Sequence, residues 1–186
     1  MPSLKQSPSV EHAGHRLTGL PPIHAPKCRI LILGSFPSPA SLAAQQYYGH
    51  PKNQFWPLLA AIMQEPLPEL DYAERIERVR AHRIGIWDVY RSCVRPGALD
   101  ADIRAGTAND FPALFPHMPH LERLCFNGQT AGKFAPRLRN LAASVLPKPP
   151  EIHILPSSSP AYTLAFGRKL ELWQRAMTFP VPAKTV

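Results

Sequence analysis

The sequence predicts an α/β domain in which four parallel strands form a sheet that helices cover on both faces. Three observations lead to this fold class. Four short apolar segments alternate along the chain with segments of helical pattern, which is the order found in parallel sheets. A chain of 186 residues is long enough to bury the core of one such domain. No internal repeat and no second domain interrupts the alternation.

The predicted strands are short runs of apolar and β-branched residues. Residues 28–34 read CRILILG, a nearly continuous apolar run that is typical of a central strand buried on both faces. The other three are IGIWDVY at residues 84–90, a strand in LERLCFNG that ends at about Asn127, and EIHILP at residues 151–156.

Helices are predicted between and after these strands. The first follows Asn53, whose side chain can cap it, and its apolar residues recur with helical spacing. Asp71 caps the second, DYAERIERVRAHR, whose charges indicate a solvated face. Asn109 opens a short helix that ends near Pro116, Pro136 limits or kinks a helix at residues 130–140, and the last helix covers residues 164–177.

The ends of the chain and one internal loop are predicted to lack regular structure. Residues 1–25 are predicted to be a loose arm that ends in the turn GLPP, residues 26–180 a single domain, and residues 181–186 a tail. Residues 35–52 form a long loop that is rich in aromatic residues. Loops of this length in small domains are usually functional or disordered, and the aromatic content favours a function.

The composition favours a globular protein that binds a polyanion. Hydrophobic residues make up 45% of the chain and the mean hydropathy is −0.17, which excludes the disordered class. No apolar run approaches the roughly 20 residues of a membrane helix, and the N-terminus has no apolar signal segment, so we expect a cytoplasmic protein that does not bind membranes. The formal net charge of +8 favours nucleic acid as the partner.

The cysteines give no sign of a metal site, a disulfide framework or a cofactor. Cys28, Cys93 and Cys125 are widely separated, and no CxxC motif or Cys/His cluster is present. We therefore expect reduced thiols, no bound metal and no cofactor.

The unusual loops all follow the carboxyl ends of predicted strands, where parallel sheets bind their ligands. In GSFPSP, Gly34 and the small residues after it allow a ligand to approach the backbone, although a plain turn explains them equally. The loop lacks the lysine of a phosphate-binding P-loop and the glycines of a dinucleotide site. Asp88 in WDVY is either an acceptor that holds a loop or part of the site, and Asn127 in FNGQT either makes a turn or binds a base or a phosphate.

Two further segments favour DNA contacts. In LPSSSP, Ser157, Ser158 and Ser159 offer hydroxyl and backbone N–H groups to a phosphate, although they also suit a helix cap. A serine hydrolase is disfavoured because the GxSxG motif is absent. In QQYYGHPKNQFW, Tyr48 beside a glycine is a natural stacking platform for a nucleobase, and Lys52 is a natural phosphate contact. Alternatively, Tyr47 and Tyr48 simply cover the core.

The order GSFPS, QQYYGHPKNQFW, GIWDVY with PGALDADI, FNGQTA and LPSSSPA resembles the hypoxanthine-DNA (deoxyinosine) glycosylase branch of the uracil-DNA glycosylase superfamily. The resemblance covers about residues 19–166. It implies a three-layer α/β/α fold with a central, mainly parallel four-stranded sheet. It also implies hydrolysis of the N-glycosidic bond of a deaminated base that is flipped out of DNA, by a monomeric, monofunctional enzyme.

The resemblance also implies roles for individual residues. Phe36 stands where the superfamily usually has a polar residue that positions water, and Leu155 stands where a histidine often precedes Pro-Ser. In the hypoxanthine branch the asparagine of the aromatic segment takes over, which here is Asn53. The implied base-binding residues are Gly34, Ser35, Phe36, Tyr48, Asp88 and Asn127, and the implied DNA-binding residues are Lys52, Ser157, Ser158, Ser159, Pro160 and Tyr162, of which Pro160 and Tyr162 help to wedge the duplex.

Two other functions fit the same sequence. One is a uracil or mismatched-thymine DNA glycosylase of the same fold. The other is a protein that binds DNA damage without catalysis, since the usual water-positioning residue is absent.

Overall fold

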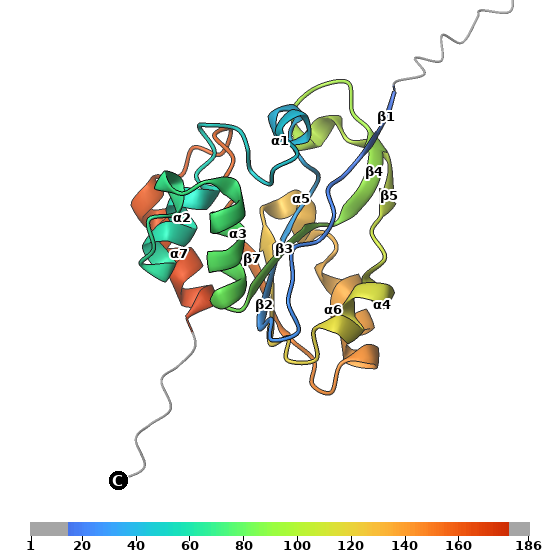
Figure 1. The fold of residues 1–186 in the computed structure, drawn as a ribbon. Helices are drawn as coiled ribbons and strands as arrows, with labels where there is room; N and C mark the ends of the chain where they lie inside the picture. Colours follow the sequence, from blue (N-terminus) through green and yellow to red (C-terminus); the bar gives the residue numbers. More distant parts are fainter. Residues whose placement is uncertain (1–14, 179–186) are drawn as a thin grey trace, which may run out of the picture.

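The computed structural model describes residues 15–178 and shows three layers, with a sheet between two groups of helices (Figure 1). The four strands of this sheet are β2 (Ile30–Gly34), β3 (Ile84–Asp88), β6 (Arg123–Asn127) and β7 (Glu151–Leu155). They are arranged in the order β3-β2-β6-β7, and all neighbouring strands are parallel. The predicted fold class is confirmed.

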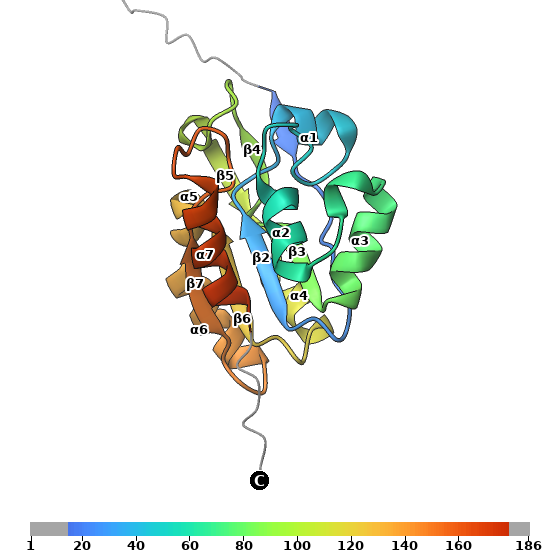
Figure 2. The same cartoon turned by 90° about the vertical axis from the view of Figure 1, so that its left-hand side faces the viewer.

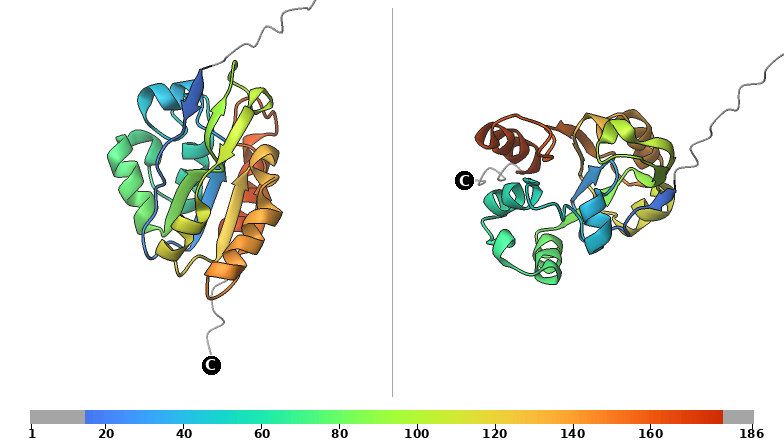
Figure 3. Two further views of the ribbon diagram at one scale, coloured as in Figure 1. Left: turned by 90° about the vertical axis from the view of Figure 1, so that its right-hand side faces the viewer. Right: turned by 90° about the horizontal axis from the view of Figure 1, so that it is seen from above.

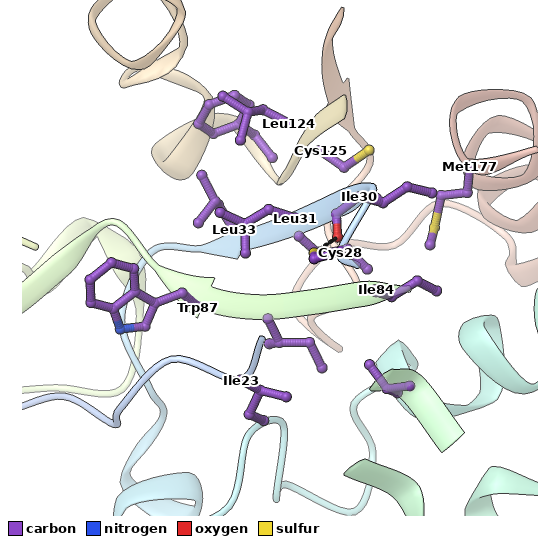
Figure 4. Packing of buried hydrophobic residues seen from close by; sticks show 14 of the residues in the cluster. Ile23, Cys28, Ile30, Leu31, Leu33, Ile84, Trp87, Leu124, Cys125 and Met177 are labelled. Carbon is purple, nitrogen blue, oxygen red and sulfur yellow. Dashed lines mark hydrogen bonds between the residues drawn. The ribbon is translucent and has the colours of Figure 1, made fainter. Parts of the chain in front are cut away.

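Strand β2 lies inside the sheet, as its apolar sequence predicts. All five of its residues are buried, and its side chains pack on both faces. Figure 4 shows Ile30, Leu31 and Leu33 of β2 among the side chains of β3 and β6. Because parallel strands run in one direction, their carboxyl ends meet at one edge of the sheet, and there Gly34 of β2 pairs with Asp88 of β3.

Helices form a layer on each face of the sheet (Figures 1 and 3). One layer holds α2 (Phe55–Met63), α3 (Tyr72–Ala81) and α7 (Phe166–Met177), and the other holds α4 (Phe111–Leu114), α5 (Gln129–Gly132) and α6 (Ala135–Val145). Short 3₁₀ turns lie at Leu67–Glu69, Asp100–Asp102 and Phe115–His117. No helix in the described part of the chain is long and apolar enough to cross a membrane.

The helix caps explain where several helices begin. Asp71 accepts a hydrogen bond from the backbone N–H of Glu74 at 2.8 Å, and Glu74 accepts one from the backbone N–H of Asp71 at 3.2 Å, so the predicted cap of α3 is confirmed as a reciprocal capping box. The prediction for Asn109 is wrong. Asp110 caps α4 instead, because the Asn109 amide donates to the backbone oxygen of Asp88 at 2.8 Å.

Proline accounts for another correction. The single helix predicted at residues 130–140 is two helices, α5 and α6, with Pro136 in the first turn of α6. Proline lacks an N–H group and therefore suits the start of a helix but not its interior.

A second sheet was not predicted. It is antiparallel, in the order β1-β4-β5, and consists of β1 (Arg16–Thr18), β4 (Tyr90–Val94) and β5 (Arg104–Ala108). The strand predicted at residues 84–90 is thus two elements, since β3 ends at Asp88 and β4 begins at Tyr90 in a different sheet. The residues of β5, RAGTA, are mostly exposed and show no apolar alternation, so their strand could not be recognised from the sequence.

The predicted boundary of the N-terminal arm at residue 25 is wrong for the described residues 15–25. Strand β1 pairs with β4, and Ile23 exchanges two backbone hydrogen bonds of 2.8 Å with Ile86. Leu20 and Ile23 are buried in the core, which gives this segment the apolar contacts that order it. The rest of the predicted arm, residues 1–14, and the predicted tail at residues 181–186 lie outside the described residues.

The loop predicted at residues 35–52 contains a short helix, α1 (Pro39–Ala44), which Ser38 caps. This helix, the segment between β4 and β5, and the loop before α7 lie at the same end of the molecule (Figure 2). That end is the carboxyl edge of the parallel sheet.

The three cysteines are buried and are not joined in disulfides. Burial raises the pKa of the Cys28 and Cys125 thiols to about 12, so both remain protonated and unreactive at neutral pH.

Candidate active site

A cavity of about 100 Å³ opens at the carboxyl edge of the parallel sheet. It brings together most of the residues that the sequence singled out. Among the predicted residues, its wall contains Gly34, Ser35, Phe36, Tyr48, Asn53, Asp88, Asn127, Ser157, Ser158 and Ser159. Its other lining residues are Pro37, Ser38, Ser41, Tyr47, Arg95, Ala98 and Asp100, which were not predicted as site residues.

Gly34 ends β2 directly beneath two polar groups of the cavity. A Cβ atom at this position would lie 2.3 Å from Asp88 Oδ1 and 3.0 Å from the Tyr48 hydroxyl. These distances are too short for a side chain, so the glycine allows the carboxyl and the hydroxyl to approach the same point above the strand.

Tyr48 presents its hydroxyl to the cavity from a strained backbone position, with φ at 55°. One face of its ring stacks on Phe55, with ring centroids 3.7 Å apart and an interplanar angle of 13°. The hydroxyl is buried and makes no hydrogen bond of standard geometry among the described residues, although the Asn127 side chain lies near enough to oppose the rise in the pKa of Tyr48. Burial and, to a lesser degree, the charge of Asp88 raise the pKa of Tyr48, so its hydroxyl keeps its proton and can donate a hydrogen bond.

Tyr47 also lines the cavity but is buried as part of the hydrophobic core. Its ring is buried, and its hydroxyl lies 3.1 Å from the Leu20 carbonyl oxygen and 3.0 Å from the Pro21 carbonyl oxygen. The two tyrosine ring centroids are 6.3 Å apart. Tyr47 thus fixes the segment that carries Tyr48.

Asp88 is a buried carboxyl group at the end of β3, with only 3% of its surface exposed. Its Oδ2 atom has no hydrogen-bond partner within residues 15–178. Burial, aided by the negative charge of Asp100 and opposed by Arg95, raises the pKa of Asp88 to about 8. At neutral pH the group is therefore mostly a neutral acid, which can donate one hydrogen bond and accept another.

Arg95 and Asp100 are site residues that the sequence analysis missed. Asp100 accepts a hydrogen bond of 2.6 Å from the Ser35 hydroxyl. Arg95 is buried, donates to the Pro37 carbonyl oxygen at 2.6 Å, and lies 5.3 Å from the centre of the Phe36 ring. Both therefore hold the loop after β2. The sequence could have indicated both residues, because Asp100 lies in the motif PGALDADI and Arg95 directly precedes it.

Asn53 lines the cavity just before α2. Its side-chain oxygen accepts a hydrogen bond of 3.0 Å from the backbone N–H of Phe55, the first residue of α2. The predicted cap is therefore off by one residue: the N-cap of α2 is Gln54, and Asn53 contacts the helix start from the position before it. An amide oxygen has two lone pairs, so one remains for a further donor.

Asn127 and Ser158 join the ends of β6 and β7. The Asn127 amide donates to the Ser158 hydroxyl at 2.8 Å, and its oxygen accepts from the Ser158 backbone N–H at 2.9 Å. Ser158 is 0% exposed, so its hydroxyl faces the interior and not a phosphate. Ser157 and Ser159 are partly exposed. The prediction that all three serines face the DNA backbone is therefore corrected at Ser158.

The remaining predicted DNA contacts lie outside the cavity. Lys52 and Pro160 are exposed, and Tyr162 is 46% exposed. Tyr162 lines a neighbouring groove together with Ser157 and Asp100. Within the described residues, no group of His, Cys, Asp and Glu side chains is arranged to hold a metal ion.

Comparison with known proteins identifies the family. Residues 21–179 match the family model described as the uracil DNA glycosylase superfamily. The chain belongs to this superfamily. It is 39% identical over 143 residues to a hypoxanthine DNA glycosylase of Methanosarcina acetivorans, a match that covers 77% of this chain and 86% of the relative. It is 37% identical over 158 residues to a hypoxanthine DNA glycosylase of Methanosarcina barkeri, which covers 85% of this chain and 96% of the relative.

A solved structure supports the same assignment. The solution NMR structure of a candidate uracil DNA glycosylase from Methanosarcina acetivorans superposes with a TM-score of 0.77 and is 35% identical in sequence. The superposition covers 88% of this chain and 97% of the other. The resemblance to the hypoxanthine branch of the superfamily, inferred from the motifs, is thereby confirmed.

Phe36 and Leu155 are the two residues that the motif resemblance places where the superfamily often has polar side chains. Phe36 is buried with its ring beside Arg95, and Leu155 is buried in the core. Neither side chain can bind water. Asn53, by contrast, presents a polar side chain at the cavity wall.

Proposed function

We propose that this member of the uracil DNA glycosylase superfamily is a monofunctional DNA glycosylase that releases hypoxanthine from deoxyinosine in DNA. One observation carries the proposal. Besides Arg95 Nε, the residues that line the cavity at the carboxyl edge of the sheet hold two buried polar groups that make no hydrogen bond of standard geometry among the described residues, Tyr48 Oη and Asp88 Oδ2, and Asn53 lines the same cavity. The names of the two hypoxanthine DNA glycosylase relatives support the choice of base.

The two unpartnered groups suit the edge of a deaminated base. Deamination replaces an exocyclic amino group by a carbonyl oxygen and leaves an N–H on the neighbouring ring nitrogen. A neutral carboxyl group can donate to that oxygen and accept from that N–H, and the Tyr48 hydroxyl supplies a further donor. Leaving buried polar groups unpaired costs about 1–3 kcal/mol each, and this cost is recovered when the base enters.

The chemistry needs an oriented water molecule more than a strong base. As the bond between the base and C1′ breaks, the sugar becomes oxocarbenium-like and the departing base takes the bonding electrons. The second lone pair of the Asn53 oxygen accepts a hydrogen bond from water and directs its oxygen to C1′. Water thus supplies a hydroxyl group to the sugar and a proton to the base.

The residues around the cavity suit the DNA backbone. Ser157 and Ser159 are partly exposed residues, and Lys52 adds a positive charge beside Asn53. Pro160 and Tyr162 are exposed in the same loop as the serines. Flipping a base out of the duplex leaves a gap, and we propose that Pro160 and Tyr162 fill it. The net charge of +8 favours DNA as the partner. We further propose a monomer that acts in the cytoplasm.

A second candidate substrate is uracil, because its O4 and N3–H present the same pattern of acceptor and donor to Asp88. Thymine in a mismatch presents the same O4 and N3–H groups. A protein that only binds damaged DNA remains the alternative outside catalysis.

A base-release assay distinguishes these functions. Duplexes that contain deoxyinosine, deoxyxanthosine, deoxyuridine or a mismatched thymine are incubated with excess enzyme, and free base is quantified. We expect hypoxanthine to be released faster than the other bases. We also expect that borohydride traps no covalent adduct between the protein and the DNA. Binding to deoxyinosine DNA without release of any base would contradict the proposal.

A further inference from the structure

Lys169 is a buried ammonium group in the first turn of α7, only 1% exposed. Its Nζ atom donates two hydrogen bonds of 2.8 Å, one to the Gln54 side-chain oxygen and one to the Tyr162 backbone oxygen. The centre of the Tyr162 ring is 5.3 Å from Nζ, within the range of a cation–π contact. The side chain therefore fills an interior position in which two of its three donors are bonded to protein oxygens.

These contacts join the two segments that form the mouth of the cavity. Gln54 directly follows Asn53, and its backbone N–H donates to the Ser158 backbone oxygen at 2.9 Å. Tyr162 closes the other end of the serine loop. Lys169 thus connects the segment that carries Asn53 with the loop that carries Ser157 and Ser159. Helices α2 and α7, which begin at these segments, pack side by side (Figure 2).

The interior placement of Lys169 is costly for the folded protein. Both acceptors are neutral oxygens, and no ion pair of Lys169 with a carboxylate occurs within residues 15–178. Burial alone lowers the pKa of Lys169, which reports the cost of removing the charge from water. An apolar side chain would avoid this cost but could not bond Gln54 and Tyr162 at the same time.

We propose that Lys169 is a positioning residue that holds the Asn53 amide in place for catalysis by fixing Gln54 against the serine loop. The inference depends on the proposed function, in which Asn53 orients water. Gln54 makes no side-chain bond to the helix start, so its side chain is committed to Lys169 and not to capping α2. A small displacement of a group that orients a reactant lowers the rate strongly.

The test is a double-mutant cycle in single-turnover base release from deoxyinosine duplex, at saturating enzyme. Lys169→Met keeps the length of the side chain but removes its donors. In the wild-type background we expect Lys169→Met to lower the rate by about tenfold. In the Asn53→Ala background we expect it to lower the residual rate by less than about twofold, because the amide that Lys169 positions is already gone. An equal loss in both backgrounds would overturn the proposal.

Further variants keep the test decisive if Lys169→Met does not fold. Gln54→Leu removes only the acceptor, and we expect the same dependence on Asn53. Gln54→Glu retains an acceptor oxygen and should keep the rate within about threefold of wild type. Arg175→Met, which removes an exposed cation from the last turn of the same helix, should leave the rate unchanged. Absence of hypoxanthine release by the wild-type protein would instead refute the proposed function.

Discussion

Asn127 at the end of β6 holds Ser158 after β7 by two hydrogen bonds, one to its hydroxyl at 2.8 Å and one from its backbone N–H at 2.9 Å. Two motifs that lie 31 residues apart are thereby fixed to each other at the cavity. The relationship assigns Asn127 a structural task that its sequence context left open.

We predict that the two hydrogen bonds between Asn127 and Ser158 contribute to the stability of the fold. Asn127→Leu leaves the buried N–H and hydroxyl of Ser158 unpaired and should lower the free energy of unfolding by about 2–4 kcal/mol. Ser158→Ala removes one bond and keeps the other, so it should cost only about 1 kcal/mol. Urea denaturation of both variants measures the difference. A larger loss for Ser158→Ala than for Asn127→Leu would contradict the arrangement.

The space above Gly34 gives a second prediction. Gly34→Ala places a methyl group against Asp88 Oδ1 and the Tyr48 hydroxyl, and overpacking of this kind costs about 1–3 kcal/mol. Since the displaced groups are those proposed to bind the base, hypoxanthine release should also fall by at least about tenfold.

Gly167→Ala is the matched control for this substitution. A Cβ at Gly167 meets no atom within 4 Å, and the residue lies in the first turn of α7. Alanine there should leave the rate of base release unchanged and should raise stability by up to about 1 kcal/mol. Equal rates for the Gly34 and Gly167 variants would show that the Gly34 contact is unimportant.

The raised pKa of Asp88 predicts how stability depends on pH. An unfolded aspartate loses its proton near pH 4, whereas Asp88 in the folded protein loses it at about pH 8. Between these values the folded state holds one more proton than the unfolded state, so this residue makes stability fall as pH rises from about 4 to 8. Asp88→Asn removes the titrating group. From about pH 4 to about pH 8 the unfolding free energy of the wild type should therefore fall relative to that of Asp88→Asn. Above about pH 8 the difference between the two proteins should stay constant.

Chemical denaturation of both proteins at several pH values measures that difference. A difference that does not vary with pH would show that Asp88 titrates normally. The same ionisation should lower base release above about pH 8, because the carboxylate can no longer donate to the base carbonyl.

Much of this site could be predicted from the sequence, because parallel strands place their carboxyl ends together. Gly34, Tyr48, Asn53 and Asp88 lie around one cavity for that reason, although they are far apart in the chain. The four strands could be recognised because buried strands are continuously apolar.

Features that depend on tertiary contacts could not be predicted. Strand β5 is exposed on both sides and carries no periodic signal. Lys169 occurs in the charged sequence GRKLELWQR, where nothing distinguishes a buried ammonium from its exposed neighbours. The Ser158 hydroxyl points into the protein because it accepts a hydrogen bond from Asn127, which lies on a different strand.

Tyr48→Phe should have opposite effects on stability and activity. The hydroxyl is buried and makes no hydrogen bond of standard geometry in the described part of the chain, so its removal should leave the stability of the free protein unchanged or raised by about 1 kcal/mol. Base release should fall by about tenfold, because the donor to the base is lost. Tyr48→Leu also removes the stacking surface and should lose about 1–3 kcal/mol more in binding of the flipped base. Thermal melts and single-turnover rates measure both effects. A wild-type rate for Tyr48→Phe would limit the role of Tyr48 to stacking.

The central claim is that the Asn53 amide orients water, and it must be separated from the contact of Asn53 with the start of α2. Asn53→Ser and Asn53→Asp both keep an oxygen that can accept from the Phe55 N–H, whereas Asn53→Ala does not. Serine is too short to hold the same water, while aspartate retains an oxygen at the same reach. Thermal melts identify any loss of folding.

The most direct measurement is the single-turnover rate of hypoxanthine release from deoxyinosine duplex by Asn53→Ala, with DNA affinity measured in parallel. The account predicts a rate that is lower by about two to four orders of magnitude, equivalent to roughly 3–5 kcal/mol of activation free energy, with nearly unchanged DNA binding and a loss of stability of only about 1 kcal/mol. Asn53→Ser should behave like Asn53→Ala, and Asn53→Asp should retain part of the activity. A well-folded Asn53→Ala that releases hypoxanthine at nearly the wild-type rate would contradict the account.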